Sequence, residues 1–125
     1  MSHNYRVEPL RYYLIKLREL RHLTQKKVAV HLEMETHNYS AIENGYRGKG
    51  KFMNAERLVK LAEVFDISLE VICAFEIRYQ SIIKEALSFK RNSPEQNAII
   101  RRYINECNSE SFIQQFFHQE EFPVK

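Results

Sequence analysis

Three features of this 125-residue sequence predict an all-α fold. Apolar residues recur every three or four positions along most of the chain, beginning with Leu10, Leu14 and Leu17. Serine, threonine, asparagine and proline stand where helices would begin. No segment alternates apolar and polar residues for long enough to form a half-buried strand, so we expect no β-sheet.

Three helices are expected in the first third of the chain. The first starts with Pro9 at its first helical position, where a missing amide hydrogen costs nothing. Thr24 caps the second by accepting a hydrogen bond from an orphan backbone amide. The third ends at Gly45, because glycine readily adopts the positive φ that closes many helices.

Five further helical segments are expected after a glycine-rich loop. Asn54 caps a fourth helix that ends near Phe65, and Ser68 caps a fifth. Beyond Ile77 a separate apolar stripe continues to about Lys90.

Two more helices are expected at the end of the chain, the first from a start signal and the second from its apolar residues. Ser93, Pro94 and Gln96 predict a helix start, with a cap, a proline at the first position and a capping box. Apolar residues then recur at helical spacing as far as Cys107. Residues 112–117 form a short last helix.

Composition excludes several classes of protein. With 44% hydrophobic and 28% charged residues, the chain belongs to ordinary globular proteins. It has no apolar run of about 18 residues and a polar N-terminus, so we expect a cytoplasmic protein with no membrane partner.

Cys73 and Cys107 are expected to be buried free thiols. No nucleophile with an adjacent base, no phosphate loop and no metal-ligand spacing is present, which predicts no enzyme, no cofactor and no metal.

Positive charge is concentrated in the first part of the chain. Residues 1–51 contain ten lysines and arginines and five glutamates, a net charge of +5. Since the whole chain carries +3, the remainder carries −2. A basic field on one half of a small protein is typical of nucleic-acid binding.

The third predicted helix has a distinctive outer face. Tyr39 and Ile42 are three positions apart and share the inward side. The outward side is left to Thr36, His37, Ser40 and Ala41. These side chains are short, which suits a helix that enters the DNA major groove, because bulk would keep its backbone away from the base edges. The pattern therefore predicts a helix-turn-helix that reads DNA.

Four groups of residues between Leu10 and Ile72 resemble, in order and spacing, the phage lambda and 434 repressor family, also called the Cro or XRE type. They are residues 16–21, residues 23–25 with 28–29, residues 42–45, and residues 58–62 with 67–69. The resemblance implies a lambda-repressor-like five-helix DNA-binding domain with additional C-terminal helices. We place the domain at 1–76 and a helical extension for dimerisation or partner binding at 77–125.

The resemblance also implies roles for single residues. Base contacts are expected from Thr36, His37, Ser40 and Ala41. The resemblance implies phosphate contacts from Gln25 and Asn44, and we expect one from Asn38 as well. Independently of the resemblance, the loop residues Arg47, Lys49 and Lys51 are expected to contact phosphates, because the alternating glycines would let the backbone approach DNA; the alternative is a solvated charged loop. Arg18 is expected to pair with Glu43 and to brace the first helix against the recognition helix.

Three positions depart from the family pattern. Glu33 replaces the usual turn glycine, so a left-handed backbone would cost about 1 kcal/mol more there, and we expect a different turn geometry. Glu35 replaces the usual serine or threonine cap. The connection 46–53 is longer than usual.

The C-terminal apolar residues leave alternatives open. Ile99, Tyr103, Phe112, Phe116 and Phe117 could form a homodimer contact, bind another protein or fold back on the core. A dimer would place two recognition helices about 34 Å apart on a palindromic site. The predicted function is a sequence-specific transcriptional regulator that binds double-stranded DNA as a dimer. The alternative is an antitoxin-like or other protein-interaction module.

Overall fold

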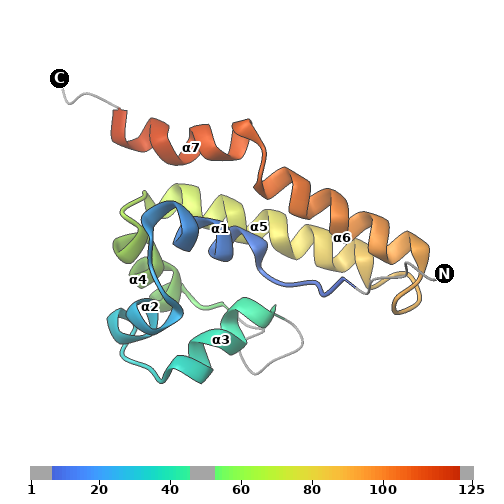
Figure 1. Cartoon of the computed structure of the whole chain (residues 1–125), viewed down its shortest axis with the longest axis horizontal. Coiled ribbons are helices and arrows are strands. Elements are labelled where there is room, and N and C mark those ends of the chain that lie inside the picture. The colour runs from blue at the N-terminus through green and yellow to red at the C-terminus, as the bar shows by residue number, and fades with distance from the viewer. Residues whose placement is uncertain (1–6, 46–52, 122–125) are drawn as a thin grey trace.

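The structure is a computed structural model that describes residues 7–45 and 53–121, with side chains described as far as Phe116 in the second range (Figure 1). The described residues form helices and loops and no strand, which confirms the all-α prediction. The helices are α1 (Tyr12–Arg21), α2 (Gln25–His31), α3 (Thr36–Asn44), α4 (Ala55–Phe65), α5 (Leu69–Ala86), α6 (Pro94–Cys107) and α7 (Glu110–Glu121).

The first helix begins later than the sequence predicts. Pro9 lies before α1, and Tyr12 is the first helical residue. The backbone at Arg11 is not helical, with φ −77° and ψ 75°, and its amide donates a hydrogen bond to the carbonyl of Glu43 at 2.8 Å. The segment before α1 is therefore attached to the end of α3, which prevents it from continuing the helix.

Four predicted cap residues take their expected places. Thr24, Asn54, Ser68 and Ser93 each precede a helix, and each side-chain oxygen accepts a hydrogen bond from the backbone amide three residues later, at 2.8 to 3.1 Å. Each bond satisfies one of the amides that a helix start leaves without a partner. The starts of α2, α4, α5 and α6 are thus set by local sequence.

The capping box predicted for α6 has a different partner. Gln96 Oε1 accepts a hydrogen bond from the amide of Asn92 at 2.9 Å, not from the amide of the cap residue. Its Nε2 donates to the carbonyl of Ala86 at 3.0 Å. Asn92 has a φ of 61°, a left-handed conformation that asparagine tolerates better than most residues. Gln96 therefore joins the end of α5 to the start of α6.

Helix α5 is longer than predicted. It runs unbroken through Ile77, where we expected the repressor-like pattern to end and a new stripe to begin. No glycine or proline occurs between Leu69 and Ala86. The boundary that we placed between the DNA-binding domain, 1–76, and the extension, 77–125, therefore falls inside this helix.

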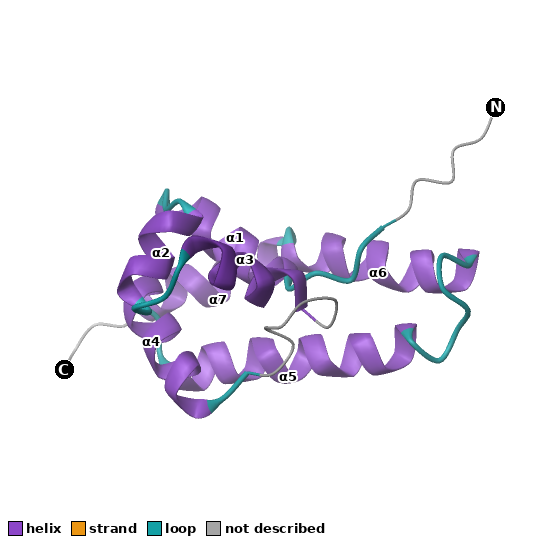
Figure 2. Ribbon diagram, turned by 90° about the horizontal axis from the view of Figure 1, so that it is seen from below, coloured by secondary structure: helices purple, strands orange, loops and turns teal. Residues whose placement is uncertain are grey.

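The C-terminal helices pack on the rest of the chain. In Figures 1 and 2, α6 runs back along α5, and α6 also contacts α1. The ring of Phe112 in α7 stacks on Phe75 in α5, with centroids 4.4 Å apart. The guanidinium of Arg21 in α1 lies 4.2 Å from the centroid of Phe116. The buried side chains from Tyr13 to Phe116 form one hydrophobic cluster.

Candidate functional site

Helices α2 and α3 pack against each other and leave one side of α3 open (Figure 2). Val28 and Ala29 of α2 are buried, as are Tyr39 and Ile42 of α3. On the open side, Thr36, His37, Asn38 and Asn44 are exposed, and Ser40 and Ala41 are half-buried. The residues expected to contact bases therefore lie together on one accessible face.

The turn between α2 and α3 keeps a left-handed residue. Glu33 has a φ of 58°, although it is not glycine, so our expectation of a different geometry at this position was wrong. This conformation costs about 1 kcal/mol more for glutamate than for glycine. The turn is held by backbone hydrogen bonds from the amide of Glu33 to the carbonyl of Val30 and from the amide of Met34 to the carbonyl of Ala29, both at 3.0 Å. Glu35 is the cap residue of α3, but its side chain makes no capping hydrogen bond.

The end of α3 requires a glycine for two reasons. Gly45 has φ 69° and ψ −133°, a region that side chains disfavour strongly. A Cβ atom at this position would lie 2.0 Å from the hydroxyl oxygen of Tyr79 in α5. That hydroxyl donates a hydrogen bond to the carbonyl of Pro9 at 3.1 Å. Gly45 thus lets α5 and the segment before α1 approach the end of α3.

One side of α3 is held by the pair that the sequence analysis expected. Arg18 in α1 contacts both carboxylate oxygens of Glu43, with Nε to Oε2 at 2.5 Å and Nη2 to Oε1 at 3.2 Å. The Arg18 side chain is 18% exposed and that of Glu43 is 3% exposed. Burial would lower the pKa of Arg18, but its hydrogen bond to Glu43 and the charge of that carboxylate outweigh burial and raise it.

Gln25 belongs to the same group of side chains. Its Nε2 donates a hydrogen bond to Glu43 Oε1 at 2.8 Å. We call Arg18, Glu43 and Gln25 the open network, because it lies beside the accessible face of α3. A phosphate contact by the Gln25 side chain, as the resemblance implies, would use the atoms that this bond leaves available.

A second network, which the sequence analysis missed, holds the end of α3. Arg11 is fully buried and donates two hydrogen bonds to Glu76 of α5, at 2.9 and 3.0 Å. Its Nη1 donates to the carbonyl of Ile42, in the last turn of α3, at 2.7 Å. A cation is favoured there, because the last carbonyls of a helix carry partial negative charge.

Other side chains complete the surroundings of Glu76. The hydroxyl of Tyr13 donates to Oε1 at 2.6 Å, and the amide of Gln80 donates to Oε2 at 2.6 Å. Burial, and then the charge of Glu76, raise the pKa of Tyr13 well above its ordinary value. We call Arg11, Glu76, Tyr13 and Gln80 the enclosed network.

One sequence feature could have revealed the enclosed network. Glu76 lies within the apolar stripe of α5, next to Phe75 and three positions before Tyr79, and Arg11 precedes the buried stripe of α1. A carboxylate on a buried stripe and a guanidinium directly before another indicate a pair, since an isolated buried charge is costly.

The residues expected at a partner contact are buried within the chain. Ile99, Tyr103, Phe112 and Phe116 are 6%, 3%, 6% and 0% exposed. They pack against α1 and α5, so the interpretation of these four side chains as a dimer surface is wrong for the folded chain. The side chain of Phe117 and the residues Arg47, Lys49 and Lys51 lie outside the described residues.

Other expectations concern cysteines, metals and membranes. Cys107 is buried and Cys73 is half-buried, and both are free thiols. Burial raises the pKa of Cys107 to about 12. Within residues 7–45 and 53–121, no group of three potential ligands could hold a metal ion. The same residues include no helix with the length and apolar character that a membrane span needs.

Comparisons of the chain with protein-family models, with curated proteins and with solved structures gave no match.

Proposed function

We propose that this chain is a sequence-specific regulator that binds double-stranded DNA through a lambda-repressor-like helix-turn-helix, with α3 as the recognition helix. The observation that carries this proposal is the contrast between the two sides of α3. Its inner side is fixed by two charged networks, and its outer side presents short polar residues. A helix that reads base edges needs both a fixed position and an accessible face.

Base contacts are assigned to Thr36, His37, Ser40 and Ala41, whose side chains reach the open side of α3. Such short side chains would let the helix backbone approach the base edges in the major groove. Asn38 in the first turn of α3 and Asn44 at its last position are both exposed and are assigned to phosphates.

Two lysines support binding to the DNA backbone. Lys26 and Lys27 are exposed in the first turn of α2, where the positive end of the helix disfavours cations by a few tenths of a kcal/mol. Neither side chain makes an ion pair that would offset this cost within the described residues. Positive charges in such a place suit contacts with phosphate groups.

Selection of bound sequences from a random pool of double-stranded DNA tests the proposal. We expect a defined consensus, and we expect His37→Ala and Ser40→Ala to change it, with about 1 to 3 kcal/mol lost per base contact. The matched control is Ser81→Ala, an exposed serine on α5 that should leave the consensus unchanged.

Salt dependence separates backbone contacts from base contacts. Lys26→Ala should weaken binding to all sequences alike and reduce the salt slope by about one, whereas the control Lys90→Ala, in the loop after α5, should not. A palindromic consensus would indicate two copies on the DNA, and a single half-site would indicate one. Failure to enrich any sequence would contradict the proposed function.

A further inference from the structure

Helix α5 carries an open face with an apolar centre. Ile77 is 70% exposed, the largest fraction among the exposed large apolar residues of the part of the chain that the structure describes. One turn before it, Ala74 is exposed and Cys73 is half-buried. In Figure 2, α5 runs along one edge of the molecule. An exposed isoleucine beside small side chains suits contact with another helix, because small side chains let two helix axes approach closely.

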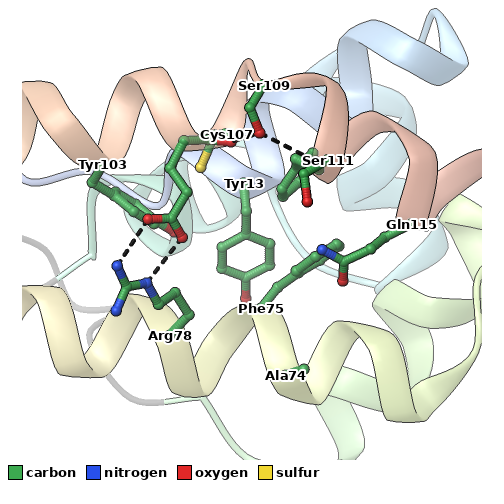
Figure 3. A pocket seen from close by; sticks show the side chains of 11 residues that line it. Tyr13, Ala74, Phe75, Arg78, Tyr103, Cys107, Ser109, Ser111 and Gln115 are labelled. Carbon is green, nitrogen blue, oxygen red and sulfur yellow. Dashed lines mark hydrogen bonds and ion pairs between the residues drawn. The ribbon is translucent and has the colours of Figure 1, made fainter.

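Two charged residues that flank this face are occupied by α6. Arg78 lines a pocket of about 310 Å³ between α5, α6 and α7, and it donates two hydrogen bonds to Glu106 at 2.9 and 2.8 Å (Figure 3). Glu85 lies 3.8 Å from Arg102. Both flanking charges are therefore paired within the same chain.

Two other charges on α5 are exposed and make no ion pair with the described residues. They are Glu70, in the first turn, and Lys84, in the last. Each is seven positions from Ile77, about two helical turns, so the three residues lie within roughly 20° of one line along the helix. We call Glu70, Cys73, Ala74, Ile77 and Lys84 the α5 face. Its two charges are placed symmetrically about Ile77 and have opposite signs.

We propose that the α5 face binds the same face of a second copy of this chain, with the two α5 helices antiparallel and Ile77 of both copies at the two-fold axis. Such an axis makes identical surfaces face each other. Residues seven positions before Ile77 then lie opposite residues seven positions after it, so Glu70 of each copy meets Lys84 of the other. A crossing angle near 20° keeps both pairs within reach. A parallel arrangement would instead bring like charges together.

The dimer should be weak and reversible. A single helix face with one large apolar residue offers less than the roughly 1,200 Å² that standard interfaces bury. Ion pairs open to water add little at physiological salt and more at low salt. We therefore expect a Kd on the order of 100 μM at low salt, so that the chain is monomeric at the roughly 5 μM suited to denaturation measurements.

Sedimentation equilibrium of the full chain tests the proposal. At about 50 mM NaCl, the average mass should rise above the 15.0 kDa of one copy as the concentration increases from about 5 to about 500 μM. Raising NaCl to about 500 mM should weaken the dimer at least three-fold, roughly, because the ion pairs are screened. A mass that stays at 15.0 kDa over the whole range would overturn the proposal.

A matched pair of serine variants locates the contact. Ile77→Ser should weaken dimerisation about ten-fold. Val30→Ser, at a residue of α2 that is 68% exposed, should leave it unchanged. Both positions are exposed, so both variants should fold, and thermal unfolding checks this. Equal dimerisation by the two variants would place the contact elsewhere and would exclude the α5 face.

Charge reversal tests the antiparallel arrangement. Glu70→Lys and Lys84→Glu should each weaken dimerisation about ten-fold, because like charges then meet across the axis. An equimolar mixture of the two variants should dimerise at least as well as the unmodified chain, since each variant carries the charge that the other lacks. Glu95→Lys, which reverses an exposed charge in the first turn of α6, is the control and should have no effect.

The mixture gives the decisive result. If it dimerises no better than either variant alone, Glu70 does not meet Lys84 of the other copy and the proposed contact is wrong. None of these measurements involves DNA, so their failure would leave the proposed function intact.

Discussion

The two networks that hold α3 differ in solvent access and in how far apart their residues lie in the sequence. The open network joins Arg18 to Glu43, 25 positions apart, beside an accessible helix face. The enclosed network joins Arg11 to Glu76, 65 positions apart, and has no exposed guanidinium. A buried charge that loses its partner is far more costly than one that water can reach. The enclosed network should therefore control stability, and the open network should mainly adjust the position of α3.

The largest effect is expected from Glu76→Ala. It leaves the Arg11 guanidinium buried without its carboxylate, which should reduce the free energy of unfolding by about 3 to 5 kcal/mol. Urea denaturation gives this value, with Glu70→Ala, an exposed position on the same helix, as control. The double variant Arg11→Met with Glu76→Leu should recover much of the loss, since no unpaired charge remains. A Glu76→Ala protein as stable as the control would contradict the assigned weight of this network.

Gly45→Ala should reduce the stability of the fold by altering the backbone at the C-terminal end of α3. The added Cβ would meet the Tyr79 hydroxyl and would stand at a φ that alanine disfavours, so we expect a loss of about 2 to 4 kcal/mol. Thermal unfolding measures it. Because part of the cost is the contact with the hydroxyl, the same substitution should cost less in a Tyr79→Phe background. An equal cost in both backgrounds would mean that backbone conformation alone requires the glycine.

Glu43→Ala should have a smaller effect on stability. Arg18 is 18% exposed and can recover some hydration, so we expect a loss of about 1 to 3 kcal/mol, below that of Glu76→Ala. The proposed DNA affinity should still fall, since α3 loses its attachment to α1. Parallel urea denaturation of both glutamate variants checks the order. A reversed order would show that the open network is the stronger one.

Alkaline pH should produce the smallest effect, through the Tyr13 phenol of the enclosed network. Its pKa in the folded chain is raised above the ordinary value of 10, so its contribution is present below pH 10 and is lost as pH rises further. Stability of the Tyr13→Phe protein should fall less steeply above pH 10, by at most about 1.4 kcal/mol per pH unit, which corresponds to one proton. Denaturant midpoints between pH 8 and 11 give the slopes, and identical slopes would exclude Tyr13 as a contributor.

Local features of the sequence account for much of the fold. The pairing of Arg18 with Glu43, which are 25 positions apart, is predicted by the resemblance to the repressor family. The caps at Thr24, Asn54, Ser68 and Ser93 depend on residues three positions away. Such short-range relations can be recognised without coordinates.

The features that were missed depend on packing between distant segments. The attachment of Arg11 to the end of α3 delays the start of α1, and no local pattern around Pro9 indicates it. The burial of Phe112 depends on where the unbroken α5 places Phe75. An apolar stripe predicts that a face is covered, but the same stripe serves equally for the chain's own core and for a partner.

The unbroken course of α5 also bears on whether the chain can be divided. Adjacent residues of this helix support different parts of the molecule. Glu76 binds Arg11, which holds the end of α3, whereas Phe75 stacks on Phe112 of α7. Slow hydrogen exchange in α3 and in α7 should then report a common opening event. A fragment ending at residue 75 would lack Glu76, the partner of the buried Arg11. The N-terminal helices therefore do not form an independent folding unit without the remainder of α5.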